Sequence, residues 1–277
     1  MKNNTGRALR RILLYTTLLL GSAIFLVPFL WMVSSSLKTT EQIFEIPPRL
    51  LPDPPQWANY TNSVQAIPFL RYLLNTLLIC AGTVLANVFS ASLVAYSFGI
   101  LKWRGRNTLF KVLLATMLLP PQVTMVPVFV IFRHLGMIDT FWPLVLPALF
   151  GTPFFIFLMR QFYLGIPYDL VEAARIDGCR EWTIYWRVIM PLSGPALATI
   201  ALFSFIWAWT DFMNPLIYLQ DQNKFTLSLG LQQFQESNNA QWGLLMAAST
   251  LITLPLVILF FTLQKYFVEG IATTGLK

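Results

Sequence analysis

Residues 160–191 read RQFYLGIPYDLVEAARIDGCREWTIYWRVIMP and form a polar stretch between two apolar segments of the chain. The stretch contains four acidic and four basic residues, whereas the two apolar segments contain no charged residue. Each apolar segment reaches the roughly 20 residues with which a helix crosses the hydrocarbon core of a bilayer. We therefore expect the polar stretch to be a folded element that leaves the membrane and binds a partner.

The composition of the whole chain indicates an integral membrane protein surrounded by lipid. Hydrophobic residues make up 56% of the 277 residues and charged residues only 11%, whereas a soluble domain has about a quarter charged residues. The net charge is +7, but the bases lie in short clusters beside apolar segments, as membrane topology requires, so we expect no nucleic-acid partner. Cys80 lies in an apolar segment and Cys179 in the polar stretch, which argues against a disulfide between them.

Six segments without Asp, Glu, Lys or Arg are each long enough to cross a bilayer. A backbone in lipid must satisfy its own hydrogen bonds, so these segments are predicted to be helices. The sequence thus predicts an all-α integral membrane protein with six transmembrane helices. The predicted spans are Ile12–Leu37, Tyr72–Leu101, Val112–Phe132, Thr140–Met159, Val188–Thr210 and Ser237–Gln264.

The distribution of bases predicts the orientation. With the N-terminus inside, fourteen bases lie on the inner side and five on the outer side, so we expect cytoplasmic N- and C-termini and a cytoplasmic polar stretch. Residues 1–70 then comprise the N-terminal tail, the first helix and a proline-rich outer loop. Residues 71–265 comprise helices two to six with the cytoplasmic loop 160–191, and residues 266–277 form a cytoplasmic tail. Five prolines between Pro47 and Pro55 favour an extended outer loop with no domain of its own.

Motifs for catalysis, nucleotide binding and metal binding are absent from the sequence. There is no Gly-x-x-x-x-Gly-Lys-Ser/Thr loop to hold ATP and no His-Glu-x-x-His motif for a metal ion. The single histidine, His134, falls at the outer end of a predicted helix, where we expect a surface residue. We therefore predict that the chain is not an enzyme and that it binds no cofactor, metal ion or ATP itself.

Asp211 is the one acidic residue placed where it can line a transport path, near the outer end of the fifth span. Its carboxylate either caps a helix end or pairs with another residue near the outer surface, or it forms a polar wall of the path. The same two interpretations apply to Asn214, one turn further on. On a helical wheel, Asp211 shares a face with Ala201, Ser204 and Ala208.

The second span repeats small residues at every fourth position, at Gly82, Ala86 and Ser90. This spacing predicts close packing against another helix. Asn75 and Asn87 lie in the same segment, and they are the residues for which a pore-lining role is the alternative.

In the third span, the double proline Pro120-Pro121 is predicted to break the helix, and the freed carbonyls need protein or water partners. Gln122 is therefore a candidate for the path, although a kink for packing explains the break equally.

Trp207 and Trp209 fit the aromatic belt at a membrane interface, but sugars stack on aromatic rings, so a sugar route is the alternative. The path candidates are Asn75, Asn87, Gln122, Trp209, Asp211 and Asn214.

Local chemistry predicts a helix–turn–helix structure for residues 167–191, which we call the knob. Pro167 favours a helix start, and Asp169 and Glu172 fall in the first turn, where the helix dipole favours acids. Gly178 is suited to end this helix in the left-handed conformation. A second helix over residues 181–189 is expected to lead to Pro191 at the start of the fifth span.

The spacing in the knob resembles the cytoplasmic signature of the inner-membrane permeases of ABC importers, which reads Glu-Ala-Ala, three residues, Gly, nine residues, Ile-x-Leu-Pro. Glu172-Ala-Ala174, Gly178 and Pro191 match in place, whereas Val188 and Met190 replace the Ile and Leu. The stretches PFLWMVSSSLK (28–38), RYLLNT (71–76) and FVEG (267–270) are similar to carbohydrate permeases, especially the shorter, MalG-like subunit. At 209–212, WTDF departs from that family's Trp-Asn-acid-Phe pattern, which weakens any transfer of solute contacts.

The resemblance implies a type I ABC importer permease fold in a prokaryotic inner membrane. It implies a second homologous permease, a cytoplasmic ATPase dimer that uses ATP and magnesium, and an external solute-binding protein. The expected solute is a di- or oligosaccharide, and glycerol phosphate or a polyol is the alternative. Rival interpretations are a stand-alone secondary transporter and a non-transporting membrane scaffold. The residues implied in ATPase docking are Glu172, Ala173, Ala174, Asp177, Gly178 and Pro191.

Overall fold

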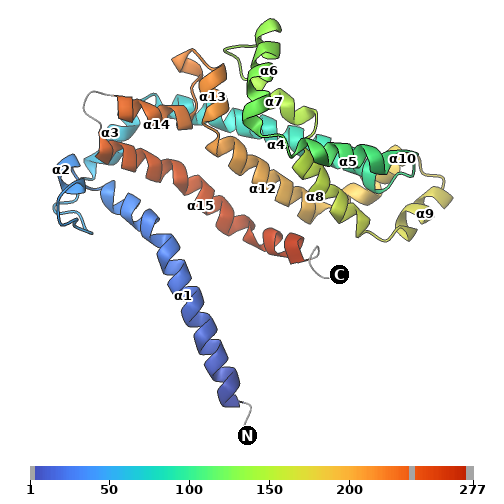
Figure 1. Ribbon diagram of the computed structural model, residues 1–277, viewed down its shortest axis with the longest axis horizontal. Coiled ribbons are helices and arrows are strands. Elements are labelled where there is room, and N and C mark those ends of the chain that lie inside the picture. The colour runs from blue at the N-terminus through green and yellow to red at the C-terminus, as the bar shows by residue number, and fades with distance from the viewer. Residues whose placement is uncertain (1–3, 237–240, 273–277) are drawn as a thin grey trace. The chain divides into compact units, whose positions relative to one another are not determined.

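The computed structural model describes residues 4–236 and 241–272, and helices make up most of them, with no β-strand in these two ranges (Figure 1). The helices are α1 (Asn4–Ser35), α2 (Thr40–Ile43), α3 (Ala58–Ala66), α4 (Phe69–Gly99), α5 (Arg106–Thr116), α6 (Pro121–His134), α7 (Trp142–Leu149), α8 (Pro153–Leu164), α9 (Asp169–Ile176), α10 (Glu181–Ile184), the π-helix η1 (Tyr185–Ile189), α11 (Met190–Leu192), α12 (Gly194–Thr210), α13 (Met213–Tyr218), the 3₁₀-helix η2 (Gln222–Lys224), α14 (Leu227–Glu236) and α15 (Trp242–Ala272).

The described residues belong to two compact units. The first consists of Met1–Phe69 with Leu231–Pro255, and the second of Leu70–Gly230 with Leu256–Lys277. Residues 71–265, predicted to comprise helices two to six, contribute to both units.

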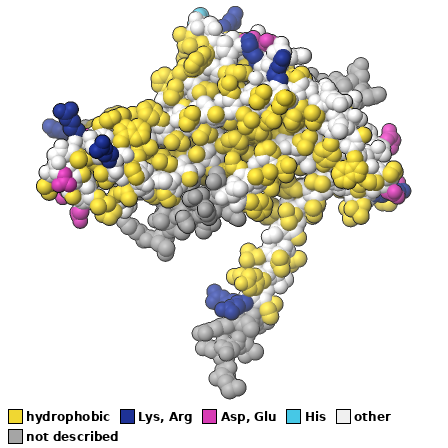
Figure 2. Space-filling model, turned by 180° about the vertical axis from the view of Figure 1, so that it is seen from behind, with side chains coloured by type: hydrophobic (Ala, Val, Ile, Leu, Met, Phe, Trp, Pro, Cys, Tyr) yellow, Lys and Arg dark blue, Asp and Glu magenta, His cyan; other side chains and the backbone are white. Residues whose placement is uncertain are grey.

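Among the described residues, four helical segments are long and apolar enough to cross a membrane, and the number is up to six if each of two bent helix pairs counts as one span. The four are Arg10–Ser35, Phe69–Gly99, Trp142–Leu164 and Trp242–Thr262. The predicted all-helical class is thus confirmed, and the four to six apolar spans agree with the six predicted segments, with boundaries shifted by a few residues. In Figure 2, hydrophobic side chains cover most of the visible surface and charged side chains gather in small groups at its margins, as expected where lipid surrounds the protein.

The two remaining spans are bent. The break predicted at Pro120-Pro121 in the third span is confirmed, whereas the fifth span was predicted as one continuous helix and the structure corrects this. Arg106–Thr116 meets Pro121–His134 at 96°, and Glu181–Leu192 meets Gly194–Thr210 at 78°. In the first pair, Pro120 and Pro121 lack the backbone N–H groups that would continue the helix, and Pro121 instead begins the next helix, where no such bond is needed. In the second pair, the turn at Ser193 separates the helices, and its Oγ donates to the carbonyl of Ile189 at 2.5 Å.

The second unit has its core where α4 packs against α7, α8 and the knob. Gly82 on α4 lies so close to α7 that an added Cβ would be 3.0 Å from Cγ1 of Val145. About two turns further along α4, Ser90 Oγ donates to the carbonyl of Ala148 at 2.8 Å. The predicted packing role of the small residues on the second span is confirmed. A buried cluster continues along the same helices and includes Ala91, Ala95, Tyr96, Phe155, Ile156, Met159, Tyr163, Ile184, Tyr185, Ile189 and Ile200.

In the first unit, the outer loop is more ordered than its prolines suggested. It contains α2 and α3, and the side chain of Lys38 is fully buried. Lys38 Nζ donates to the carbonyl of Arg49 at 2.6 Å and lies 4.4 Å from the ring centre of Trp31. Asn59 Nδ2 donates to the carbonyls of Ser36 and Lys38, each at 2.9 Å. These contacts fold the chain back on itself, and burial lowers the pKa of Lys38.

Candidate functional site

The knob has the helix–turn–helix form predicted from its sequence. Its first helix, α9, carries Asp169 and Glu172 in the first turn and begins at Asp169, two residues later than Pro167 suggested. Gly178 follows with φ +78°, so the predicted left-handed position is confirmed. The second segment covers residues 181–189 as expected, but its last five residues form the π-helix η1. In Figure 1, α9 lies at one end of the second unit and α13 at the other.

Polar contacts tie the two arms of the knob to each other and to α4. Arg175 Nε donates to Oε1 of Glu181 at 2.8 Å, and its Nη1 donates to the hydroxyl of Tyr168 at 2.6 Å. The other carboxylate oxygen of Glu181 accepts a 2.7 Å hydrogen bond from Tyr96 on α4. Nearby, the hydroxyls of Tyr185 and Ser92 are 2.7 Å apart. Movement of the knob is therefore expected to be transmitted to α4.

The residues proposed for docking divide into an exposed set and a supporting residue. Glu172 and Ala173 are exposed on α9, Asp177 and Gly178 are exposed in the turn after it, and Pro191 is exposed on α11. Ala174 belongs instead to the buried core cluster, so it supports α9 from within.

Large apolar side chains on the knob were not singled out in the sequence, although apolar residues inside a polar stretch could have drawn attention to them. Ile176 is 86% exposed, and Trp182 is 56% exposed. Leu170 and Trp186 are exposed as well. Exposed apolar groups gathered on one small element typically mark a protein–protein contact.

A second candidate site is an open groove of about 380 Å³ in the second unit, within the size range of small-molecule sites. Thr76 and Asn87, both on α4, line it and lie eleven residues apart, so its α4 wall is about 16 Å long. The other walls come from α7, the start of α8, α12 and the segment around α13. The lining residues are Thr76, Ile79, Thr83, Asn87, Leu144, Pro147, Ala148, Gly151, Thr152, Pro153, Ser204, Trp207, Ala208, Asp211, Pro215 and Thr226.

Asn87 is the centre of a polar network in this groove. Its Nδ2 donates to Ser204 Oγ on α12 at 2.8 Å, and its Oδ1 accepts from Thr152 Oγ1 at 2.7 Å. Asn87 and Ser204 are buried, and Thr152 is half-buried. The network therefore connects α4, α12 and the start of α8 across the groove.

Asp211 and Trp207 lie on the α12 side of the groove. The two carboxylate oxygens of Asp211 accept from the backbone N–H of Asn214 at 3.2 Å and from its Nδ2 at 2.8 Å. Asp211 thus accepts hydrogen bonds from the first turn of α13 and also lines the groove, a position compatible with both interpretations offered by the sequence. Trp207 is 47% exposed, and its ring stacks on Phe155 with ring centres 4.8 Å apart.

The other path candidates lie elsewhere. Trp209 is only 3% exposed, so Trp207 is the tryptophan that faces the groove. Gln122 is exposed on α6 and does not line the groove. Asn214 is exposed and pairs with Asp211. Asn75 donates to the carbonyls of Asn223 and Phe225, at 2.9 and 3.0 Å.

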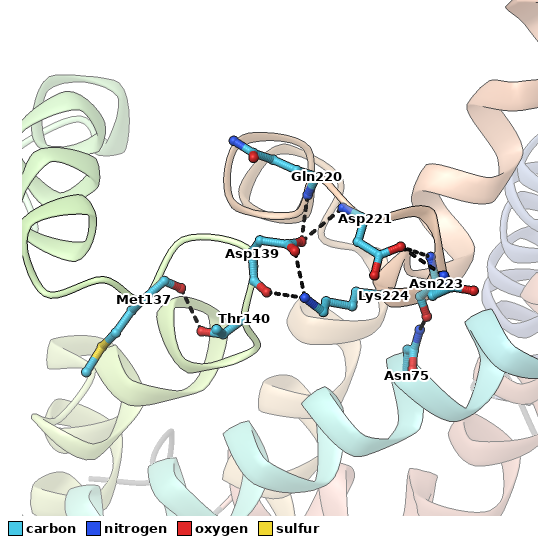
Figure 3. Close-up of polar contacts among 8 residues, drawn as sticks. All are labelled: Asn75, Met137, Asp139, Thr140, Gln220, Asp221, Asn223 and Lys224. Carbon is cyan, nitrogen blue, oxygen red and sulfur yellow. Dashed lines mark hydrogen bonds and ion pairs between the residues drawn. The ribbon is translucent and has the colours of Figure 1, made fainter.

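Near Asn75, a polar clasp joins the loop before α7 to the loop after α13 (Figure 3). Asp139 has φ 59° and accepts from the backbone N–H groups of Gln220 and Asp221, each at 3.0 Å. Lys224 Nζ donates to its other carboxylate oxygen at 2.6 Å. These donors lower the pKa of Asp139 to about 2. The residues around Asn75 therefore hold the two loops together.

Within residues 4–236 and 241–272, the structure offers no group of three or more His, Cys, Asp or Glu side chains placed to hold a metal ion. Cys80 and Cys179 are both free thiols. His134 is exposed at the end of α6, as predicted. The features with functional potential are thus an exposed knob and a groove, which suit binding and movement.

Comparison with known families agrees with this conclusion. The sequence profile of the family described as "Binding-protein-dependent transport system inner membrane component" matches residues 87–273, which is more than half of the chain. The chain belongs to this family. As a binding-protein-dependent permease of the ABC class, it is an inner-membrane transport component that works with a solute-binding protein and an ATPase, and it is not itself an enzyme.

Relatives of this permease match along almost the whole chain. It is 35% identical to the probable ABC transporter permease YurM of Bacillus subtilis, over 90% of this chain and 83% of the relative. It is 30% identical to the arabinooligosaccharides transport permease AraQ of Bacillus subtilis, over 96% of each chain. A bacterial ABC transporter involved in import of the acidic polysaccharide alginate contains a chain of the same fold, with TM-score 0.82 and 24% identity, covering 96% of this chain and 99% of that chain.

Proposed function

We propose that this permease is one of two homologous membrane subunits of an ATP-driven importer for a neutral di- or oligosaccharide. An external binding protein delivers the sugar, and a cytoplasmic ATPase dimer, which holds ATP and magnesium, binds the knob. One observation carries the proposal: the knob presents exposed apolar and acidic side chains while its own polar contacts fasten it to the core.

The geometry of the knob supports its role in docking. Glu172 is exposed in the first turn of α9, Asp177 and Gly178 are exposed just after its C-terminal end, and Ile176, the last residue of α9, is 86% exposed. A docked partner would cover this apolar surface. When the ATPase subunits move, the Glu181–Tyr96 hydrogen bond and the buried contacts behind α9 would carry the knob's displacement to α4 as a rigid body.

The sugar assignment draws on different observations. AraQ, which matches 96% of the chain, is an arabinooligosaccharide permease. The groove combines hydroxyl and amide side chains with an exposed indole, a combination that suits a sugar. An ATP-driven mechanism also fits the scarcity of acids in the spans, because a stand-alone proton- or sodium-driven transporter usually has several ionisable groups there.

A matched pair of glycine substitutions tests the docking proposal. Gly178 has φ +78° and Gly136 has φ +67°, and an added Cβ would meet nothing within 4 Å at either position. Gly178→Asp and Gly136→Asp therefore impose similar backbone strain and add the same charge, but only the first alters the knob. The assay is co-purification of the ATPase with the tagged permease from membranes that contain the complete importer.

We expect Gly178→Asp to insert normally and to lose ATPase association by at least about tenfold, which corresponds to about 1.4 kcal/mol. Gly136→Asp should retain the ATPase. Glu172→Lys, which reverses a charge on the same exposed surface, should behave like Gly178→Asp. Normal ATPase recovery with Gly178→Asp and Glu172→Lys would refute the docking proposal.

A further inference from the structure

We infer that the groove contacts the transported solute and selects uncharged, polyhydroxylated molecules, with Trp207 as a stacking surface and Asp211 as the group that repels anions. The inference rests on the proposed function, because it requires a solute path along this chain. It also distinguishes glycerol phosphate, which is an anion, from the two neutral solutes left open by the sequence, a sugar and a polyol.

The lining of the groove supplies hydrogen-bonding groups suited to hydroxyls. Thr83, Asn87, Thr152, Ser204 and Thr226 line it together with apolar residues. An asparagine amide has two N–H donors and two acceptor lone pairs, and the hydrogen bonds of Asn87 to Ser204 and Thr152 use one of each. The remaining donor and acceptor match a hydroxyl, which can both donate and accept.

Trp207 provides a fixed apolar surface beside these polar groups. Phe155 stacks against its indole at an interplanar angle of 29°, while Phe154 lies 5.5 Å away between ring centres. The ring is thus supported by aromatic neighbours and still 47% exposed. A rigid, half-exposed aromatic ring offers a large contact area at low entropic cost, which suits the apolar face of a sugar ring.

Asp211 decides the charge preference of the groove. It is the only charged side chain among the described residues that line the groove, and none of them is basic. Its hydrogen-bonding partner Asn214 is neutral and leaves the negative charge uncancelled. An anionic solute would meet an unpaired like charge here, whereas a neutral sugar would find an acceptor for its hydroxyls.

The test measures access to the groove without requiring the natural solute. Ala208 lines the groove on α12, three residues before Asp211, which directly follows the end of this helix. Ala208→Cys is made in a Cys80→Ser, Cys179→Ser chain, and the complete importer is reconstituted in liposomes. The rates at which the new cysteine at position 208 is modified are then measured with small methanethiosulfonate reagents. One reagent is neutral (hydroxyethyl) and the other is anionic (sulfonatoethyl). Thr61→Cys, exposed on α3, corrects for intrinsic reactivity.

We expect the neutral reagent to react about fivefold faster than the anionic one at position 208, after correction, because the carboxylate is one helical turn away. Asp211→Asn keeps a capping oxygen for α13 and should bring the two rates together. Equal rates before this substitution would overturn the charge filter. A cysteine that neither reagent reaches would show that the partner permease covers the groove, and would overturn the solute contact.

A second measurement tests the sugar class with arabinotriose, diacetylchitobiose and sn-glycerol 3-phosphate as protecting probes. We expect at least one neutral sugar to slow the modification of Ala208→Cys, and Trp207→Ala to remove that protection. Protection only by glycerol phosphate, or by none of the three, would overturn the assignment. These results are independent of ATPase co-purification, so failure of the groove inference is distinguishable from failure of the docking proposal.

Discussion

The contact between Gly82 on α4 and Val145 on α7 permits a quantitative test of the packing. An alanine Cβ at position 82 would lie 3.0 Å from Cγ1 and 3.2 Å from Cγ2 of Val145. Valine is restricted at χ1, so it cannot simply rotate away. Overpacking of this kind costs about 1–3 kcal/mol, and the better helix propensity of alanine returns up to about 1 kcal/mol. We expect Gly82→Ala to destabilise the permease by about 1–2 kcal/mol net.

Gly21 provides the matched control. It lies inside α1, and an added Cβ would meet nothing within 4 Å. Gly21→Ala therefore keeps the propensity gain without the clash, and we expect it to be neutral or stabilising by up to about 1 kcal/mol. The assay is unfolding of the purified permease in mixed micelles with increasing dodecyl sulfate, followed by circular dichroism and tryptophan fluorescence.

A double-mutant cycle isolates the contact itself. Val145→Ala alone removes two methyl groups and should destabilise the protein by about 1–2 kcal/mol. Combined with Gly82→Ala it creates room for the new methyl group, so the double variant should be more stable than the sum of the single effects predicts by about 1 kcal/mol or more. Additivity within about 0.5 kcal/mol, or equal effects of Gly82→Ala and Gly21→Ala, would refute this account of the helix contact.

Two further substitutions test the loop contacts. The pKa of Asp139 is depressed to about 2, so the clasp contributes fully above the ordinary carboxyl pKa of about 4 and is lost as the pH falls from there toward 2. Asp139→Asn should lower the free energy of unfolding by about 1 kcal/mol at pH 7, a value discounted because Lys224 is partly exposed. It should also remove the loss of protection from hydrogen exchange that acid causes at residues 218–224.

At Gly243, an added Cβ would lie 2.8 Å from the carbonyl oxygen of Lys38 and 2.9 Å from Asn59 Nδ2. Gly243→Ala should therefore expose the outer loop to proteolysis, while Gly194→Ala, with nothing within 4 Å, should not; equal cleavage of both variants would contradict the contact.

Several features of the knob follow from local chemistry, and the sequence predicted them for that reason. Asp169 and Glu172 occupy the first turn of α9, where a helix dipole favours acids. Gly178 adopts a positive φ that is costly for residues with a Cβ. The small residues of α4 were likewise predicted to pack closely, since their spacing places them on one face of a helix.

Features that depend on distant parts of the chain were predicted poorly. The choice between Trp207 and Trp209 required knowledge of which face of α12 lies against Phe155. The burial of Ala174 depends on the core beneath α9, and the exposure of Gln122 depends on the direction of α6 after its sharp bend. Proline marked that bend, but its angle of 96° is set by packing on both sides.

The sequence by itself determined the membrane class, the six apolar segments and the position of the knob, because hydrophobicity, chain length and helix-end chemistry act over a few neighbouring residues. The tertiary structure alone decided which polar residues meet. Thr152 and Ser204 follow Asn87 by 65 and 117 residues along the chain, yet the three side chains form one hydrogen-bond network. These contacts depend on how α4, α8 and α12 pack against one another. The same packing places Asp211 and Trp207 in one groove.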